Sequence, residues 1–259
     1  MGNLTGKKIL ITGGTKGLGK AVSLELASAG AKLFVIGRDT LELQRLRKNG
    51  VNAIKGDVTD KSIIENAIKE ISPEILILNA GATPVMGSIE EQTWQSFNLV
   101  WEMDVKACFF AIQAALNNGM PSGSRTYIIS SGAALVGAPM SGSYAGAKKM
   151  LWFLAQYANE LSATKGLNIT FQLIFPMQMF PETGLAKTVA AAYADNLNLT
   201  IDEYLEKRYG SPLSTGNYAE YVKQLLADPS TYNGFAYGIK KDRGITSINQ
   251  EWTQMPVSS

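Results

Sequence analysis

The chain has 259 residues, of which 46% are hydrophobic and 18% charged, and its formal net charge is +2. This size suits one large core, and a nearly neutral charge without a long basic run gives no indication of nucleic acid or an anionic membrane as a partner. The complete absence of histidine excludes Ser-His and Cys-His nucleophile pairs and histidine-ligated metal sites, so proton transfer has to use Tyr, Lys, Asp or Glu.

The single cysteine, Cys108, lies in the apolar run ACFFAI and is predicted to be a small core residue. No apolar run approaches the roughly 18 residues of a membrane span, and the first one, KKILIT, is too short for a signal sequence. We therefore expect a cytoplasmic protein without a metal site, built as a single domain over residues 1–259.

The first predicted unit is a strand, a glycine turn and a helix. Residues 7–12 read as a buried strand, and the apolar stripe of residues 18–29 reads as a helix. Between them lies TGGTKGLG, in which Gly13, Gly17 and Gly19 would let the backbone turn tightly and approach a diphosphate at the helix N-terminus. In this context the motif predicts dinucleotide binding.

Two cations near this turn bear on the choice of cofactor. The next predicted strand, residues 32–37, ends at Arg38, and Lys16 lies inside the glycine turn. An NAD-selective site usually places a carboxylate here for the ribose 2′-hydroxyl, whereas a cation would meet the 2′-phosphate of NADP. The two cations favour NADP(H) over NAD(H), while the neighbouring carboxylate of Asp39 keeps NAD(H) open.

Helices and strands continue to alternate, with helices predicted at 41–48 and 61–71 and strands at 51–57 and 74–81. This alternation predicts a doubly wound parallel α/β sheet, a Rossmann fold, with about seven strands and helices on both faces. Ligands bind such sheets at the carboxyl ends of the strands. Asp57 and the turn Asn79-Ala80-Gly81 fall at these ends, where a helix-capping or turn role is compatible with contact to a cofactor.

A long helix is predicted over residues 93–118, with Asp104 among its apolar positions. A strand leading to Ser131, a helix over residues 144–164 and a strand over residues 168–175 follow. The helix at 144–164 is apolar on more than one side, so it is either buried or packs against a partner subunit.

A hydroxyl, a phenol and an amine that could transfer protons lie between Ser131 and Lys148. Tyr144 and Lys148 are four residues apart, so on a helix the ammonium lies one turn from the phenol on the same face. A nearby cation favours the ionised form of a phenol, so such a pair can exchange protons near neutral pH. Ser131 precedes Tyr144 by thirteen residues, at the end of a strand, and a glycine- and proline-containing loop can bring the two to one cleft.

Beyond Pro176 the pattern loosens into a helical insert with a capping box at Thr200 and Glu203. We expect residues 177–216 to form a substrate lid, because the segment is hinged by Pro and Gly after a strand. Met177 is a candidate for an apolar pocket wall, a role for which core packing is an equal alternative. Residues 234–239 are predicted to be a last strand, and the tail carries no readable signal.

Taken together, TGGTKGLG, GDVTD, LNAG, IISS, YAGAK and a strand ending in proline occur in an order and at separations that resemble the short-chain dehydrogenase/reductase family. The resemblance is to the short type with a Thr-Gly-x-x-x-Gly-x-Gly motif. It covers roughly residues 5 to 180, with weaker correspondence to about 240.

The resemblance implies that Tyr144 is the general acid or base, that Lys148 promotes its ionisation and holds the nicotinamide ribose, and that Ser131 orients the substrate oxygen. It implies a homo-oligomer, either a tetramer or a dimer, acting on a small carbonyl or alcohol substrate bound by Ser131, Tyr144 and Met177. The implied cofactor contacts are Gly13, Thr15, Lys16, Gly17, Leu18, Gly19, Arg38, Asp57, Val58, Asn79, Ala80, Gly81, Tyr144, Lys148 and Pro176.

Two departures from the family pattern fall near the reacting groups. Asp104 stands where the family has an asparagine that holds a proton-relaying water, and its negative charge near Lys148 opposes phenolate formation. We therefore predict that Asp104 joins the catalytic set and biases the site towards reduction. Met177 stands where the family has glycine after the sixth strand, and the threonine that often follows is displaced, with Thr183 the nearest candidate.

The leading interpretation is an NADPH-dependent carbonyl reductase. A dinucleotide-binding regulatory or scaffold protein without redox turnover is one alternative, and a non-redox isomerase or dehydratase of a biosynthetic pathway is another. Oxidation of NADPH during turnover separates reduction from both.

Overall fold

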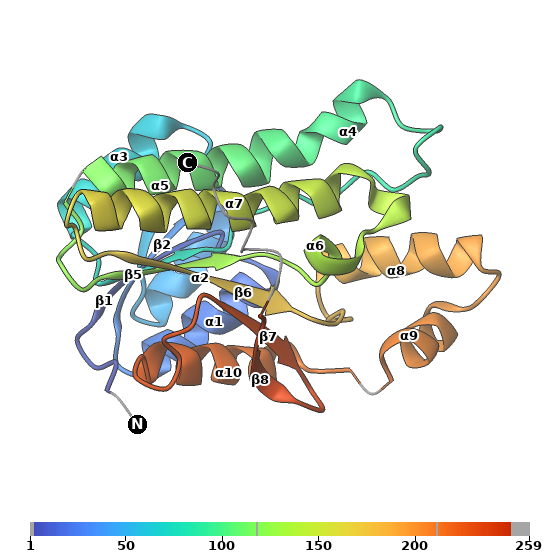
Figure 1. Cartoon of the computed structure of the whole chain (residues 1–259). Helices are drawn as coiled ribbons and strands as arrows, with labels where there is room; N and C mark the ends of the chain where they lie inside the picture. Colours follow the sequence, from blue (N-terminus) through green and yellow to red (C-terminus); the bar gives the residue numbers. More distant parts are fainter. Residues whose placement is uncertain (1–2, 118, 211, 250–259) are drawn as a thin grey trace.

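A computed structural model describes residues 3–117, 119–210 and 212–249. Its centre is an eight-stranded sheet in the order β3-β2-β1-β4-β5-β6-β7-β8, in which only β8 runs antiparallel to its neighbour (Figure 1). The strands are β1 (Lys8–Thr12), β2 (Lys32–Gly37), β3 (Asn52–Lys55), β4 (Ile75–Leu78), β5 (Arg125–Ile129), β6 (Thr170–Pro176), β7 (Ala236–Lys240) and β8 (Gly244–Ser247). The predicted doubly wound sheet is confirmed.

Helices cover both faces of the sheet (Figure 1). The helices α3 (Lys61–Ile71), α5 (Lys106–Asn117) and α7 (Ser143–Thr164) share one apolar core with the sheet. The helices α1 (Gly17–Ser28), α2 (Thr40–Lys48) and α10 (Thr215–Ala227) share the other. Because both faces are covered, the central strands are continuous apolar runs such as ILIL in β4, all four residues of which are buried.

The register of the central strands aligns their carboxyl ends. Thr12 of β1 pairs with Leu78 of β4, which in turn pairs with Ile128 of β5. The residues that follow these three strands therefore leave the sheet at one edge, side by side. The predicted strands at 51–57 and 74–81 are shorter in the structure, because their last residues belong to the turns at this edge.

The long helix predicted at 93–118 is present over residues 94–117, and Thr93 caps its N-terminus; residue 118 lies outside the described residues. The helix has three parts, namely α4 (Trp94–Val100), a π-helical turn η1 (Trp101–Val105) and α5. Asp104 lies inside the π-helical turn and is 2% exposed. Such π-helical turns alter the direction of the side chains that they carry and are frequent at functional sites.

Several elements are not among the predicted ones. They are α10, β8, the short helix α6 (Ala133–Val136) and the 3-10 turn η2 (Pro139–Ser141). The last two form the connection between β5 and α7. None of the helices in the described ranges has the length and apolar character needed to cross a bilayer.

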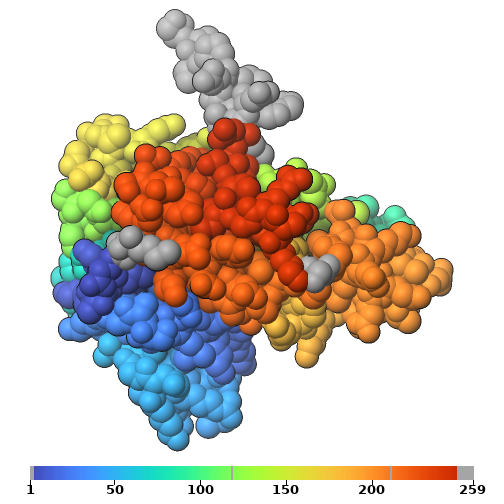
Figure 2. Space-filling model, turned by 90° about the horizontal axis from the view of Figure 1, so that it is seen from below, coloured from blue at the N-terminus to red at the C-terminus, as the bar shows by residue number. Residues whose placement is uncertain are grey.

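The insert beyond Pro176 forms a pair of helices, α8 (Gly184–Asn196) and α9 (Ile201–Tyr209), which we call the α8–α9 hairpin. The predicted capping box is present at the start of α9. The hairpin has a small core of its own, centred on Ala190, Ala194 and Tyr204. It projects from the body of the molecule as the lighter orange segment at one side of Figure 2.

Candidate active site

The predicted site residues gather at the carboxyl edge of the sheet. Gly13 follows β1, Asn79 follows β4 and Ser131 lies two residues beyond the end of β5, and these three strands are neighbours. The Thr12 hydroxyl accepts hydrogen bonds from the backbone N–H groups of Asn79, at 3.1 Å, and Ala80, at 3.3 Å. The first glycine turn and the Asn-Ala-Gly turn are thereby held against each other.

Helix α7 presents the phenol and the amine on one face, as their spacing predicts. Tyr144 lies in the first turn, and the Nζ atom of Lys148 lies 5.7 Å from the centroid of its ring. Lys148 is 5% exposed, and its Nζ donates to the backbone oxygen of Ile129 at 3.2 Å. The ammonium is therefore fixed between the end of β5 and the phenol.

Asp104 forms a buried ion pair with the same ammonium. Its Oδ2 lies 3.0 Å from Lys148 Nζ, and the two side chains are 0% and 7% exposed. Its Oδ1 accepts the backbone N–H of Ala82 at 2.7 Å. Burial alone would lower the pKa of Lys148, but the negative charge of Asp104 opposes this effect and, with a contribution from Tyr144, holds that pKa above its ordinary value.

This contact explains a glycine as well. A Cβ atom placed on Gly81 would lie 2.9 Å from Asp104 Oδ2, so the carboxylate occupies the space that a side chain at position 81 would need. The 3.0 Å separation also leaves no room for a water molecule directly between the carboxylate and the ammonium. In this chain the lysine is bound to the carboxylate itself.

Ser131 begins the connection from β5 to α7. Its Oγ accepts the backbone N–H of Ala133 at 3.2 Å, which leaves the hydroxyl proton available for donation to a ligand. The preceding Ser130 is 2% exposed and donates to the backbone oxygen of Lys148 at 2.9 Å. That bond ties the strand end to α7, and so holds the segment carrying Ser131 next to the helix that carries Tyr144.

The glycine turn has the geometry that its motif predicts. Gly13 and Gly17 have φ values of +68° and +52°, which favour glycine, and a Cβ atom on Gly13 would lie 2.7 Å from the Cα of Ala80. The side-chain amide of Asn79 donates to the Gly13 backbone oxygen at 3.1 Å. Among the remaining motif residues, Thr15 is 8% exposed beside Gly37, and Leu18 packs against the core under α1.

The N-terminus of α1 is suited to a diphosphate. Its N-cap residue, Lys16, makes no side-chain capping bond, whereas α2, α3 and α8 each begin with a side chain that accepts a backbone N–H. The first amides of α1 therefore have no side-chain acceptor, and the helix dipole favours a negative charge in front of them. The residues present fit the diphosphate of a nicotinamide dinucleotide.

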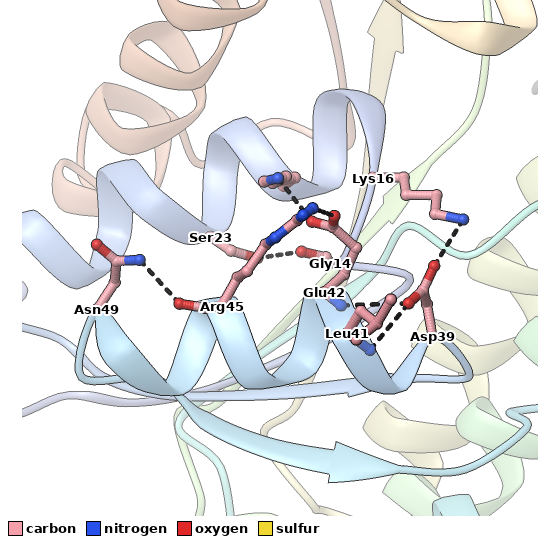
Figure 3. A network of polar contacts seen from close by, with 9 residues as sticks. Gly14, Lys16, Ser23, Asp39, Leu41, Glu42, Arg45 and Asn49 are labelled. Atoms are coloured by element: carbon pink, nitrogen blue, oxygen red, sulfur yellow. Dashed lines mark hydrogen bonds and ion pairs between the residues drawn. The ribbon is translucent and has the colours of Figure 1, made fainter.

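The two predicted cations are each close to a carboxylate. Lys16 Nζ lies 2.9 Å from Asp39 Oδ2, a contact visible in Figure 3, and Arg38 Nη1 lies 3.4 Å from Asp57 Oδ2. The Arg38 side chain is 65% exposed and that of Lys16 is 73% exposed, so both pairs are open to solvent and weak.

Asp39 and Asp57 also have local roles. Asp39 Oδ1 accepts the backbone N–H groups of Leu41 and Glu42 and so caps α2, as Figure 3 shows. Its hydrogen bond with Lys16 contributes most to the lowered pKa of the Asp39 carboxyl. Asp57 Oδ1 accepts from the backbone and hydroxyl of Thr59. Burial opposes ionisation of Asp57, but the bonds from Thr59 and the charge of Arg38 lower its pKa.

Val58, next to Asp57, is 7% exposed and packs into the core shared by α3, α5 and α7. Its side chain therefore serves the core, and a contact with the cofactor would have to involve its backbone. The neighbouring Asp57 carboxylate, in contrast, has a 39% exposed side chain at the carboxyl edge of the sheet.

The end of β6 and the segment after it lie beside the start of the connection from β5 to α7. The Pro176 backbone oxygen accepts the N–H of Gly132 at 3.0 Å, and Met177 lies beside Gly132 and Gly238. The displaced threonine, Thr183, caps α8, and its methyl and Cβ atoms lie next to Gly17 of the glycine turn. The structure thus places Thr183 by the glycine turn despite the shift in sequence.

One residue at this edge has no counterpart among the predicted ones. Tyr193 of α8 reaches the connection between β5 and α7, where its hydroxyl accepts the backbone N–H of Met140 at 3.3 Å. The sequence carries no signal for this contact, because the contact joins two segments that are 53 residues apart in the chain.

Comparisons with known proteins bear on the family of the chain. A family model described as short chain dehydrogenase matches residues 7–193. The chain is 30% identical over 243 residues to the uncharacterized oxidoreductase Lmo0432 of Listeria monocytogenes, covering 88% of this chain and 93% of that protein. It is 32% identical over 158 residues to the hydroxynaphthalene reductase arp2 of Aspergillus fumigatus, covering 56% of this chain and 57% of that protein.

The chain thus spans less than two thirds of the length of the first curated relatives that it matches. Among solved structures, a variant of the actinorhodin polyketide ketoreductase with NADPH superposes with a TM-score of 0.76 at 23% identity, covering 93% of this chain and 98% of that chain. This likeness concerns the fold. The family match over most of the chain, together with the relative that aligns almost from end to end, shows that this protein belongs to the short-chain dehydrogenase/reductase family.

Proposed function

We propose that the protein is an NADPH-dependent reductase that converts an uncharged, partly apolar ketone or aldehyde to an alcohol. The observation that carries this proposal is the placement of the Tyr144 phenol beside the Lys148 ammonium, at the carboxyl edge of the sheet where the glycine turn also lies. Reduction of a carbonyl needs a hydride donor and a proton donor. The glycine turn would hold the first and the Tyr144 phenol would be the second, and both lie at the same edge of the sheet.

A nicotinamide dinucleotide held at the glycine turn and the N-terminus of α1 would supply the hydride for the carbonyl carbon. In the proposed mechanism Ser131 donates its hydroxyl hydrogen bond to the carbonyl oxygen, and Tyr144 transfers its phenolic proton to the same oxygen as negative charge develops there. Tyr144 is left as a phenolate beside the Lys148 ammonium, which stabilises it until a proton returns. The reverse reaction, alcohol oxidation, begins from that phenolate.

Asp104 determines how strongly the ammonium favours the phenolate. A carboxylate 3.0 Å from Lys148 Nζ offsets much of the positive charge that the phenol experiences, because both groups are buried and poorly screened. The proton donor in reduction is the phenol, and it then faces an ion pair instead of an isolated positive charge. The buried ion pair thus supports the reductive direction for this chain.

We expect Asp104→Asn to shift the alkaline limb of the pH profile for reduction to lower pH. Without the carboxylate, burial dominates and the pKa of Lys148 falls, so the ammonium is lost at a lower pH than in the native protein. The measurement is kcat/KM against pH in both directions, and unchanged profiles in both would contradict the role given to Asp104.

The preference for NADPH rests on Arg38 and Lys16. Their present partners are solvent-exposed carboxylates, so exchanging them for a 2′-phosphate costs little. Asp39, the residue that would favour NADH, is engaged by the first amides of α2 and by Lys16. A carboxylate held in this way is less available to a ribose hydroxyl.

We expect Arg38→Ala to weaken NADPH binding by roughly tenfold or more, the effect of losing one charge-assisted contact, with a smaller change for NADH. Dissociation constants from fluorescence titration measure this without any need for turnover. Arg45→Ala is the matched control, because Arg45 is 67% exposed and pairs with Glu42 of the same helix. Equal losses for both dinucleotides would argue against a 2′-phosphate contact.

The chemistry of the surrounding loops supports the substrate class. Residues 128–147, 81–89 and 175–181 contain no charged side chain. They carry the exposed Val136 and the methionines Met140 and Met177, and methionine side chains adapt to apolar ligands of different shape. A carbonyl compound without charge would enter this rim at the smallest desolvation cost.

The experiment that tests the function is a panel of carbonyl compounds, incubated with NADPH or NADH and followed by the loss of reduced-nicotinamide absorbance. If the protein is a reductase, apolar ketones or aldehydes should accelerate the loss of absorbance. The alcohol should then accumulate in an amount equal to that of the NADPH oxidised. Tight dinucleotide binding without turnover would favour a regulatory role, and conversion of a substrate without oxidation of NADPH would favour isomerisation or dehydration.

An exposed apolar face on α5 and α7 indicates how the protein assembles. Phe109 of α5 and Phe153, Tyr157 and Leu161 of α7 are between 40% and 52% exposed, and these helices lie side by side on one face of the molecule (Figure 1). We propose that this apolar face packs against a second copy, giving a dimer or a tetramer.

We also propose a cytoplasmic location. Cys108 is a buried free thiol, and burial raises its pKa to about 12, which suits a reducing compartment.

A further inference from the structure

The segment just before Tyr144 is held from two sides. Met140, in the turn η2, accepts the backbone N–H of Gly87 through its carbonyl at 2.7 Å, and its own N–H donates to the Tyr193 hydroxyl at 3.3 Å. Gly87 belongs to the loop between β4 and α4, and Tyr193 belongs to the α8–α9 hairpin. The hydroxyl of Tyr193 is therefore the polar contact that joins the hairpin to this turn.

Helix α7 depends on that turn for its first residues. Its N-cap, Gly142, has no side chain to accept the first amides, and its backbone lies in an unusual region with φ of 17° and ψ of −81°. Tyr144 is two residues further along. A capping side chain commonly fixes the first turn of a helix, but none does so here, and the position of η2 contributes to this constraint.

The position of the Tyr193 hydroxyl is determined by the hairpin as a unit. The Tyr193 ring stacks on the Tyr204 ring with centroids 5.7 Å apart and an interplanar angle of 5°. Tyr204 is 6% exposed and belongs, with Ala190 and Ala194, to the core of the hairpin. Because the ring is held by this stack, a movement of the hairpin moves the hydroxyl with it.

We propose that Tyr193 is a positioning residue, which sets the first turn of α7, and with it Tyr144, by holding Met140 when the α8–α9 hairpin is seated over the site. The inference rests on the proposed function, since it assigns the hairpin as the substrate lid. A hairpin that lifts to admit the carbonyl compound releases Met140, and its return restores the bond. Proton delivery is then efficient only when the substrate is covered.

The test is Tyr193→Phe, which keeps the stack on Tyr204 and removes only the acceptor. We expect backbone hydrogen exchange in residues 138–142 to accelerate about fivefold, and kcat for carbonyl reduction to fall about fivefold, as for the loss of one hydrogen bond. The dissociation constant for NADPH should be unchanged. The control is Thr188→Val, which removes a hydroxyl from α8 at an exposed position, where that hydroxyl donates to the backbone oxygen of Gly184 in the preceding turn.

Unchanged exchange in residues 138–142 would overturn the inference, as would faster exchange without a change in kcat. Equal effects of Tyr193→Phe and Thr188→Val would also overturn it, because they would indicate general loosening of the hairpin. If the native chain bound NADPH but reduced no carbonyl compound, the proposed function would fail, and the exchange measurement would still decide whether Tyr193 holds Met140.

Discussion

Tyr144→Phe is expected to lower kcat for carbonyl reduction by about a hundred- to ten-thousandfold, the range that one well-placed acid or base contributes. The substitution removes the proton donor and keeps the aromatic ring beside Lys148, so the packing of the first turn of α7 is preserved. NADPH affinity should change little, because the glycine turn and the first amides of α1 are untouched. Stopped-flow absorbance measures the first quantity, and fluorescence titration the second.

The matched control is Tyr157→Phe, which removes the same hydroxyl from the same helix thirteen residues further along, at a position that is 52% exposed, and keeps the ring on the proposed interface. It should retain native turnover. If the Tyr144→Phe variant kept native kcat, the proton would have to come from another group, and the assignment of the whole site would be wrong. A large loss in both variants would indicate damage to α7 rather than loss of the acid.

Lys148→Met is expected to abolish turnover and to lower the free energy of unfolding by about 3–5 kcal/mol, because it leaves the Asp104 carboxylate buried without its cation. Asp104 would keep only the N–H of Ala82 as a strong partner. Urea unfolding measures the stability, and assays at a temperature at which the variant is fully folded separate stability from catalysis. Lys165→Met is the control, since Lys165 lies exposed at the end of the same helix.

The double variant Lys148→Met with Asp104→Asn tests the cause of that loss. Asparagine keeps an oxygen for the Ala82 N–H but carries no charge, so most of the lost stability should return while turnover stays absent. Because the pKa of Lys148 is raised in the folded protein, the stabilisation by the pair is complete below the ordinary lysine range of about 10 and is lost only at higher pH. No recovery in the double variant would mean that the ion pair does not carry the effect.

Much of the fold could be predicted from the sequence because it is encoded over short distances. The bounds of β1, β2, β4, α1 and α3 agree with the predicted ones to within three residues, and those of β2 and α3 agree completely. Helix α10 is not among the predicted elements, although Tyr218, Val222 and Leu225 form a buried stripe at helical spacing. Its signal was present, whereas β8, with two half-buried and two exposed residues, offers almost none.

The candidate site also has parts that the sequence could predict and parts that it could not. The Tyr144–Lys148 spacing specifies a shared helix face, and the glycine turn specifies its own backbone, so both could be predicted without tertiary information. The resemblance implied that Asp104 lies near Lys148, but the direct ion pair between them could not be predicted, because it depends on how a π-helical turn aims a side chain across to another helix. The same holds for Thr183, which reaches Gly17 despite its shifted position in the sequence.

By itself, the sequence determined the parallel sheet, the glycine turn and the placement of Tyr144 and Lys148 on one helix face, since each is a pattern within a few residues. Only the tertiary structure decided what surrounds that pair: the carboxylate on the lysine, the hydroxyl of Tyr193 on Met140, and the carboxylates beside Arg38 and Lys16. The physical reason is that contacts between distant segments are set by strand register and helix packing, and local periodicity does not encode these.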